Sequence, residues 1–192
     1  MSRTTAIWFG AAGVLNLSTW VIFTFGDPTY YNPTTLTDYA AVAGLTVSFS
    51  VTGIALILLW RDPPVTRGSP FLLLAGIGAV AVAVGDLLED GFNVENAEFV
   101  FFGGGILMIL SLIVAGVTAL TVRSPRRWSG LFLLFAVPGG IGGFGFVMLG
   151  VSWILFGLWI VHQHRAYVIA LAVAAVPALV IAIDLYWADV VG

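Results

Sequence analysis

Charged residues divide the sequence into long uncharged segments, and their spacing predicts most of the secondary structure. The segments between Arg3 and Asp27 and between Asp38 and Arg61 hold 23 and 22 uncharged residues. A helix needs roughly 20 apolar residues to cross the ~30 Å hydrocarbon core of a bilayer. Most of the long uncharged segments therefore have the length of one crossing each, and the chain reads as a bundle of membrane-spanning helices.

The longest uncharged segment, residues 128–164, has two interpretations. As one helix it would run ~55 Å at ~1.5 Å per residue, far longer than a crossing requires. As two crossings it gives short helices separated by a stretch rich in helix breakers. We favour two crossings, and a broken or re-entrant segment remains the alternative. The candidate hinge residues of this stretch are Pro138, Gly139, Gly140, Gly142 and Gly143.

The sequence thus predicts an all-α fold, a polytopic transmembrane bundle of seven helices, with six helices as the alternative. No linker is long enough to separate two domains, so residues 1–192 form a single integral membrane domain. The predicted helices span residues 5–25, 39–60, 70–88, 98–121, 129–142, 146–162 and 166–187.

Composition supports the same fold class. Hydrophobic residues make up 60% of the chain and charged residues 9%, with a mean hydropathy of +1.06. Soluble domains carry about 25% charged residues, and disordered chains are poor in apolar ones. Both classes are excluded, and we expect a multi-pass protein of the cell membrane with the lipid bilayer as its main partner.

Basic residues alternate with acidic ones from one connecting segment to the next. Arginines near helix ends stay on the cytoplasmic side of a membrane. This rule predicts a cytoplasmic N-terminus and outer loops that carry the carboxylates. The arginines that agree with this orientation are Arg3, Arg61, Arg67, Arg123, Arg126, Arg127 and, in the seven-helix interpretation, Arg165.

Several classes of function lack the residues that they need. The chain has no cysteine, and its net charge of −3 argues against nucleic-acid binding through a basic face. It has no lysine for a retinal Schiff base, and it contains none of the hydrolase, metalloprotease or P-loop motifs. We therefore expect no enzyme activity, no catalytic residues, no metal site and no cofactor.

Carboxylates just inside predicted helix ends are the main candidates for a functional role. Asp86, Glu89 and Asp90 have helical spacing and share a face of the third helix. With seven helices, Asp184 lies at the same outer side, where it can share a proton or cation with Asp86. Ionisable residues at membrane depth mark function by default. Because these positions are near the surface, we favour a solvated acidic rim, with ion handling as the alternative.

Polar residues inside the first two helices have a structural and a functional interpretation. Asn16 lies near the middle of the first helix, where an unpaired amide is costly, so we expect it to bond across to another helix. The second helix carries Thr46, Ser48, Ser50 and Thr52. Such hydroxyls commonly bond to their own helix backbone, and lining of a pore is the alternative.

Two functional hypotheses follow. The first is a small-solute or ion transport component that uses the glycine-broken segment and the outer carboxylates. The second is a non-catalytic membrane subunit or scaffold, packed against a second copy or a partner subunit. Transport predicts polar side chains that line a path at membrane depth, whereas a scaffold predicts that these side chains pair internally.

Overall fold

The computed structural model describes residues 2–26, 28, 33–61, 70–122, 125–138, 145–162, 166–170 and 173. Within these residues the protein is an all-α, polytopic helical membrane bundle, as predicted. Five helices are long and apolar enough to cross a membrane. The elements are α1 (Arg3–Gly26), α2 (Leu36–Arg61), α3 (Pro70–Asp86), the π-helix η1 (Leu87–Gly91), α4 (Glu98–Thr121), the 3-10 helix η2 (Pro125–Trp128), α5 (Ser129–Phe135) and α6 (Gly145–His162).

One predicted helix is shorter in the structure, and another lies mostly outside the described residues. The helix expected over 129–142 ends at Phe135 and is followed by a turn that reaches Pro138. The reason is local, because Pro138 has no N–H to continue the α-helical hydrogen bonds, and residues 137–138 adopt 3-10 geometry instead. Of the helix expected over 166–187, residues 166–170 are helical, and most of the rest lies outside the described residues.

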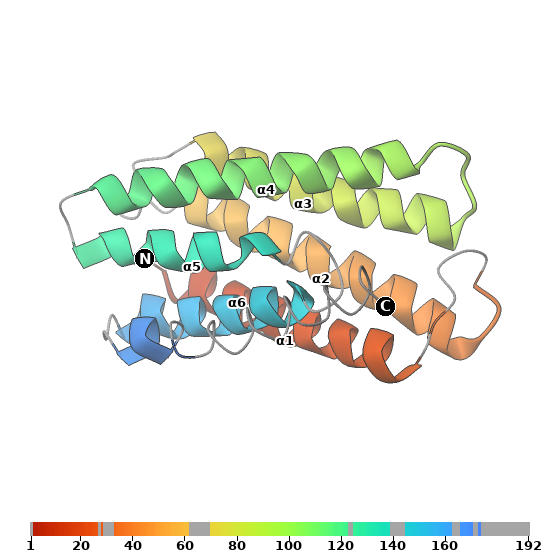
Figure 1. Ribbon diagram of the computed structural model, residues 1–192, viewed down its shortest axis with the longest axis horizontal. Coiled ribbons are helices and arrows are strands. Elements are labelled where there is room, and N and C mark those ends of the chain that lie inside the picture. The colour runs from red at the N-terminus through yellow and green to blue at the C-terminus, as the bar shows by residue number, and fades with distance from the viewer. Residues whose placement is uncertain are drawn as a thin grey trace, which may run out of the picture.

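Helices α1 to α6 form a closed ring in which each helix packs against its neighbour in the chain (Figure 1). The ring closes because α6 packs back along α1. Neighbouring helices run antiparallel, so α6 ends beside the start of α1 (Figure 1). Arg3 and His162 therefore lie at the same end of the bundle.

Paired glycines set the closest contacts between the helices. On α3 and α4, a Cβ added at Gly78 would lie 2.7 Å from the carbonyl oxygen of Gly104, and one added at Gly104 would lie 2.8 Å from that of Gly78. Small residues that let backbones approach are the typical packing device of membrane helices. The other reciprocal pairs are Gly13 with Gly150, Gly53 with Gly76, and Gly116 with Gly130.

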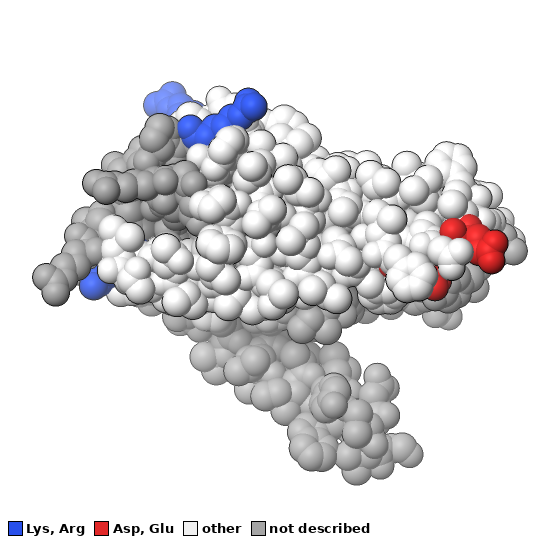
Figure 2. Space-filling view, turned by 90° about the horizontal axis from the view of Figure 1, so that it is seen from above, with Lys and Arg blue, Asp and Glu red and all other residues white. Residues whose placement is uncertain are grey.

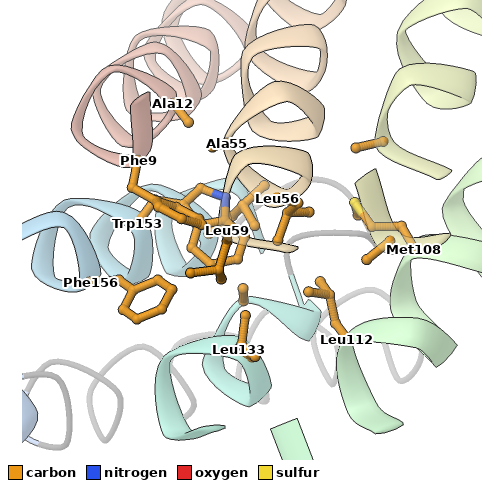
Figure 3. Close-up of a cluster of buried hydrophobic side chains, with 14 of the residues drawn as sticks. Phe9, Ala12, Ala55, Leu56, Leu59, Met108, Leu112, Leu133, Trp153 and Phe156 are labelled. Carbon is orange, nitrogen blue, oxygen red and sulfur yellow. The ribbon is translucent and has the colours of Figure 1, made fainter. Parts of the chain in front are cut away.

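An apolar cluster fills the centre of the ring toward the arginine end. Figure 3 shows Phe9, Leu59, Leu133, Trp153 and Phe156 converging from four different helices. All five are essentially inaccessible to solvent, and α3 and α4 add further apolar side chains to the same cluster. The arginine half of the described bundle is therefore packed with aromatic and aliphatic side chains.

Charge separates to the two ends of the bundle. Figure 2 shows arginine side chains at one end, carboxylates at the other and an uncharged surface between them. An uncharged band of this kind is what a protein presents to the hydrocarbon core of a bilayer. At the acidic end lie the last turn of α1, the first turn of α2 and the α3–α4 connection, with the described carboxylates Asp38, Asp86, Glu89, Asp90, Glu95 and Glu98.

Candidate functional site

Asp86 is a buried carboxylate at the acidic end of the bundle. It is the last residue of α3, and only 3% of its surface is exposed. The hydroxyl of Thr46 on α2 donates a hydrogen bond of 2.7 Å to Asp86 Oδ2. Asp86 therefore lies between two helices rather than in the solvated rim that the sequence suggested.

The charged groups that act on Asp86 have the same sign as Asp86 itself. They are Asp90 and Glu89, which follow it in the π-helix η1 and are only partly buried. No arginine or histidine of the described residues forms an ion pair with Asp86. A buried charge without a counterion is costly, so among the described residues this carboxyl group must either be protonated or be paired with a cation from outside the protein.

The π-helix explains why the three acids do not form one solvated face. We expected Asp86, Glu89 and Asp90 to share the last turn of a regular helix. The wider π turn over Leu87–Gly91 changes the angular spacing of the side chains that follow Asp86. Single π turns within helices occur frequently at functional sites. Here the turn separates a buried carboxylate from two partly exposed ones.

A second buried carboxylate, Asp38, has a complete structural explanation. Its Oδ2 accepts hydrogen bonds from the backbone N–H groups of Thr34 and Thr35, at 2.9 and 2.8 Å. Its own N–H donates to the Thr35 hydroxyl at 3.2 Å. This reciprocal arrangement is a capping box at the start of α2. Asp38 is thus a control for Asp86, because burial alone does not indicate a functional carboxylate.

Replacing Asp38 with alanine tests this structural role. We expect Asp38→Ala to lower the free energy of unfolding by about 1 kcal/mol, the usual cost of a lost helix cap. Denaturant titration in mild detergent, followed by circular dichroism, measures the change. Glu98→Ala, at an exposed acid in the first turn of α4, is the matched control with an expected loss of only a few tenths of a kcal/mol. Equal losses in the two variants would contradict the capping role.

Asn16 is fully buried near the middle of α1 and makes the expected contact with a neighbouring helix. Its Nδ2 donates to the carbonyl oxygen of Ala12 at 2.7 Å and to the Thr52 hydroxyl on α2 at 3.3 Å. The carbonyl acceptor fixes which end of the amide is nitrogen. Asn16 Oδ1 has no hydrogen-bond partner. The amide is therefore satisfied on its donor side and unsatisfied on its acceptor side.

The α2 hydroxyls divide among different partners and do not form one polar stripe. Thr46 bonds to Asp86, Ser48 bonds to the Leu45 carbonyl of its own helix, and Thr52 accepts from Asn16. Thr46 faces α3, whereas Thr52 faces α1. Polar contacts at the two helix interfaces are thus separate, with Asp86 nearer the acidic end.

The other candidates lie at different places or outside the described residues. Pro138 is the last described residue after α5, and His162 is exposed at the arginine end and stacks on Tyr167 at a ring-centroid distance of 5.9 Å. Among the residues that the structure describes, no group of three His, Asp or Glu is placed to hold a metal ion. The candidates that lie outside the described residues are Gly139, Gly140, Gly142, Gly143 and Asp184.

Two features of the site were not recognised from the sequence. Thr35 and Asp38 have the spacing of a capping box, and this signal was available in the sequence. Trp153 lies in the middle of α6 rather than at a membrane interface, and its Nε1 is buried without a hydrogen-bond partner. The only sequence signal for its burial was that Trp153 lies far from both ends of the predicted helix 146–162.

Comparison with known proteins adds no family assignment, because no family model, no curated protein and no solved structure matches the chain.

Proposed function

We propose that this protein is an ion transport component of the cell membrane, and that Asp86 binds the transported cation. The observation that carries the proposal is the burial of Asp86 in an apolar bundle, where the charged side chains that act on it among the described residues are all negative. An ionisable group in a membrane-spanning segment marks an ion or proton pathway by default. A proton or a small metal cation would neutralise the negative charge of Asp86.

The surroundings of Asp86 support entry from the acidic end. Glu89 and Asp90 lie one turn beyond it, between Asp86 and the carboxylates of the α3–α4 connection. Charge of one sign around an entrance raises the local concentration of ions of opposite sign. The Thr46 hydroxyl contacts Asp86 from α2 and adds an oxygen atom to the site.

The experiment is a flux measurement on protein reconstituted into liposomes. Separate preparations carry a gradient of H⁺, Na⁺ or K⁺ and an internal indicator for that ion. We expect the protein to dissipate at least one of these gradients faster than protein-free liposomes do. Rates that equal those of protein-free liposomes for all three ions would contradict the proposal.

A non-catalytic membrane subunit is the second candidate, and the reciprocal glycine contacts favour it. Four helix pairs meet backbone to backbone at these glycines, as in a tightly packed structural bundle. Absence of flux together with a stoichiometric partner in mild-detergent purification would favour this function over transport.

A further inference from the structure

Two complementary polar groups lie unsatisfied in the middle of the bundle. Asn16 Oδ1 is a hydrogen-bond acceptor and Trp153 Nε1 is a donor, and neither has a partner in the described structure. Both side chains are completely inaccessible to solvent. Buried polar groups are nearly always hydrogen-bonded, to protein or to ordered water. Four atoms of the described residues are exceptions, the other two being Asp90 Oδ1 and Ser129 Oγ, and the two in the interior between α1 and α6 require an explanation.

The packing of α1 against α6 brings these two groups toward each other. Gly13 and Gly150 form the close backbone contact between the helices, and each polar residue lies three positions after one of them. Side chains on a helix lean toward its N-terminus. Because α1 and α6 are antiparallel, the Cα–Cβ bonds of Asn16 and Trp153 are tilted toward each other along the helix axes, while the Trp153 ring also packs against Phe9 at a ring-centroid distance of 5.0 Å.

Both groups also lie on the side of the α1–α6 contact that faces α2. Asn16 bonds to Thr52 of α2, which fixes its direction. Figure 3 shows the indole nitrogen of Trp153 on the side of its ring that is directed toward α2. In antiparallel helices, residues three positions beyond a shared contact point turn to the same side of that contact. The two groups therefore face a common region between α1, α2 and α6.

We propose that this region is a binding site for one buried water molecule, which accepts a hydrogen bond from Trp153 Nε1 and donates one to Asn16 Oδ1. The Thr52 hydroxyl is near enough to Asn16 to provide a third polar contact. Buried waters typically make about three hydrogen bonds to groups that are otherwise unsatisfied. A metal cation does not suit this site, because an N–H donor points at it. The inference is independent of the proposed transport function.

NMR of the full-length protein in lipid nanodiscs tests the site with water itself as the probe. Labelling tryptophan with nitrogen-15 gives one indole N–H signal for each of the seven tryptophans, and Trp153→Phe identifies the signal of interest. We expect this signal to show a magnetisation-transfer cross-peak with water. A wild-type protein without that cross-peak would overturn the proposal, so the first criterion does not depend on a variant at Asn16.

Variants on either side of the site supply the second criterion. We expect Asn16→Leu to remove the water cross-peak and to shift the Trp153 indole signal. Ser48→Ala is the control, because the hydroxyl of this buried serine bonds to the Leu45 carbonyl of its own helix and should leave the signal unchanged. Persistence of the cross-peak in Asn16→Leu, or its loss in Ser48→Ala, would contradict the assignment of Asn16 as the acceptor.

Discussion

Gly104→Ala should destabilise the protein by about 1–3 kcal/mol, the usual cost of overpacking a tightly packed contact. The added Cβ would lie 2.7 Å from the backbone nitrogen of Val82 and 2.8 Å from the carbonyl oxygen of Gly78. Both are backbone atoms, which cannot rotate away as a flexible side chain does. The substitution therefore forces α3 and α4 apart and weakens the contacts along their length.

The adjacent glycine provides the control for this prediction. A Cβ added at Gly103 meets nothing within 4 Å, so Gly103→Ala should leave stability unchanged or raise it slightly through helix propensity. Denaturant titration of both variants in mild detergent, followed by circular dichroism, gives the two free energies of unfolding. A similar effect at the two positions would show that the glycine contact does not determine the packing of α3 against α4.

Asp86→Asn should reduce cation flux in reconstituted liposomes by roughly tenfold to a hundredfold. The substitution keeps the size of the side chain and removes the negative charge. A hydrogen bond to a charged group is worth about 1.5–3 kcal/mol. Because about 1.4 kcal/mol corresponds to a factor of ten, the loss of a comparable contact between Asp86 and the cation gives this range of flux. Because asparagine retains a carbonyl oxygen, the hydrogen bond from Thr46 can persist, and the bundle should remain folded.

Two other acids separate the role of Asp86 from a general effect of charge. Asp38→Asn changes a buried carboxylate that caps α2, and Glu95→Gln changes an exposed one at the same end of the bundle. Both variants should retain flux within about twofold of the wild type, because Asp38 serves to cap α2 and the exposed Glu95 mainly alters the local ion concentration. A loss in all three variants would indicate surface electrostatics, and full flux in Asp86→Asn would remove Asp86 from the pathway.

The sequence was sufficient to predict the fold class and most helix boundaries. The length of each uncharged segment follows from the thickness of the bilayer. The charged residues Arg3 and Arg61 therefore lie at the ends of α1 and α2. The predicted start and end of α4, residues 98 and 121, are those of the structure. The short α5 could not be predicted as reliably, because a single proline and the neighbouring packing decide where it ends.

The pairing of side chains between helices could not be predicted. The sequence shows many glycines, but which of them face each other depends on helix rotation and register, as for Gly78 and Gly104. The burial of Asp86 has the same origin. Its position suggested a solvated rim, whereas the π turn after it and the packing of α2 place it beside Thr46. Long-range geometry, rather than local propensity, creates the site.

The orientation of the bundle in the membrane decides whether cations that enter at the acidic end come from outside the cell. The native chain has no cysteine, so single cysteines at exposed positions report sidedness without interference. Ser2 and His162 mark the arginine end, and Asn96 marks the acidic end. A maleimide that cannot cross membranes, applied to intact cells, labels only those cysteines that face outward.

We expect external labelling of the Asn96→Cys variant, and labelling of the Ser2→Cys and His162→Cys variants only after the membrane is permeabilised. External labelling of the His162→Cys variant alongside protection of the Ser2→Cys variant would contradict the return of α6 to the arginine end. Protection of the Asn96→Cys variant with external labelling of the other two would reverse the orientation and place the carboxylates inside the cell.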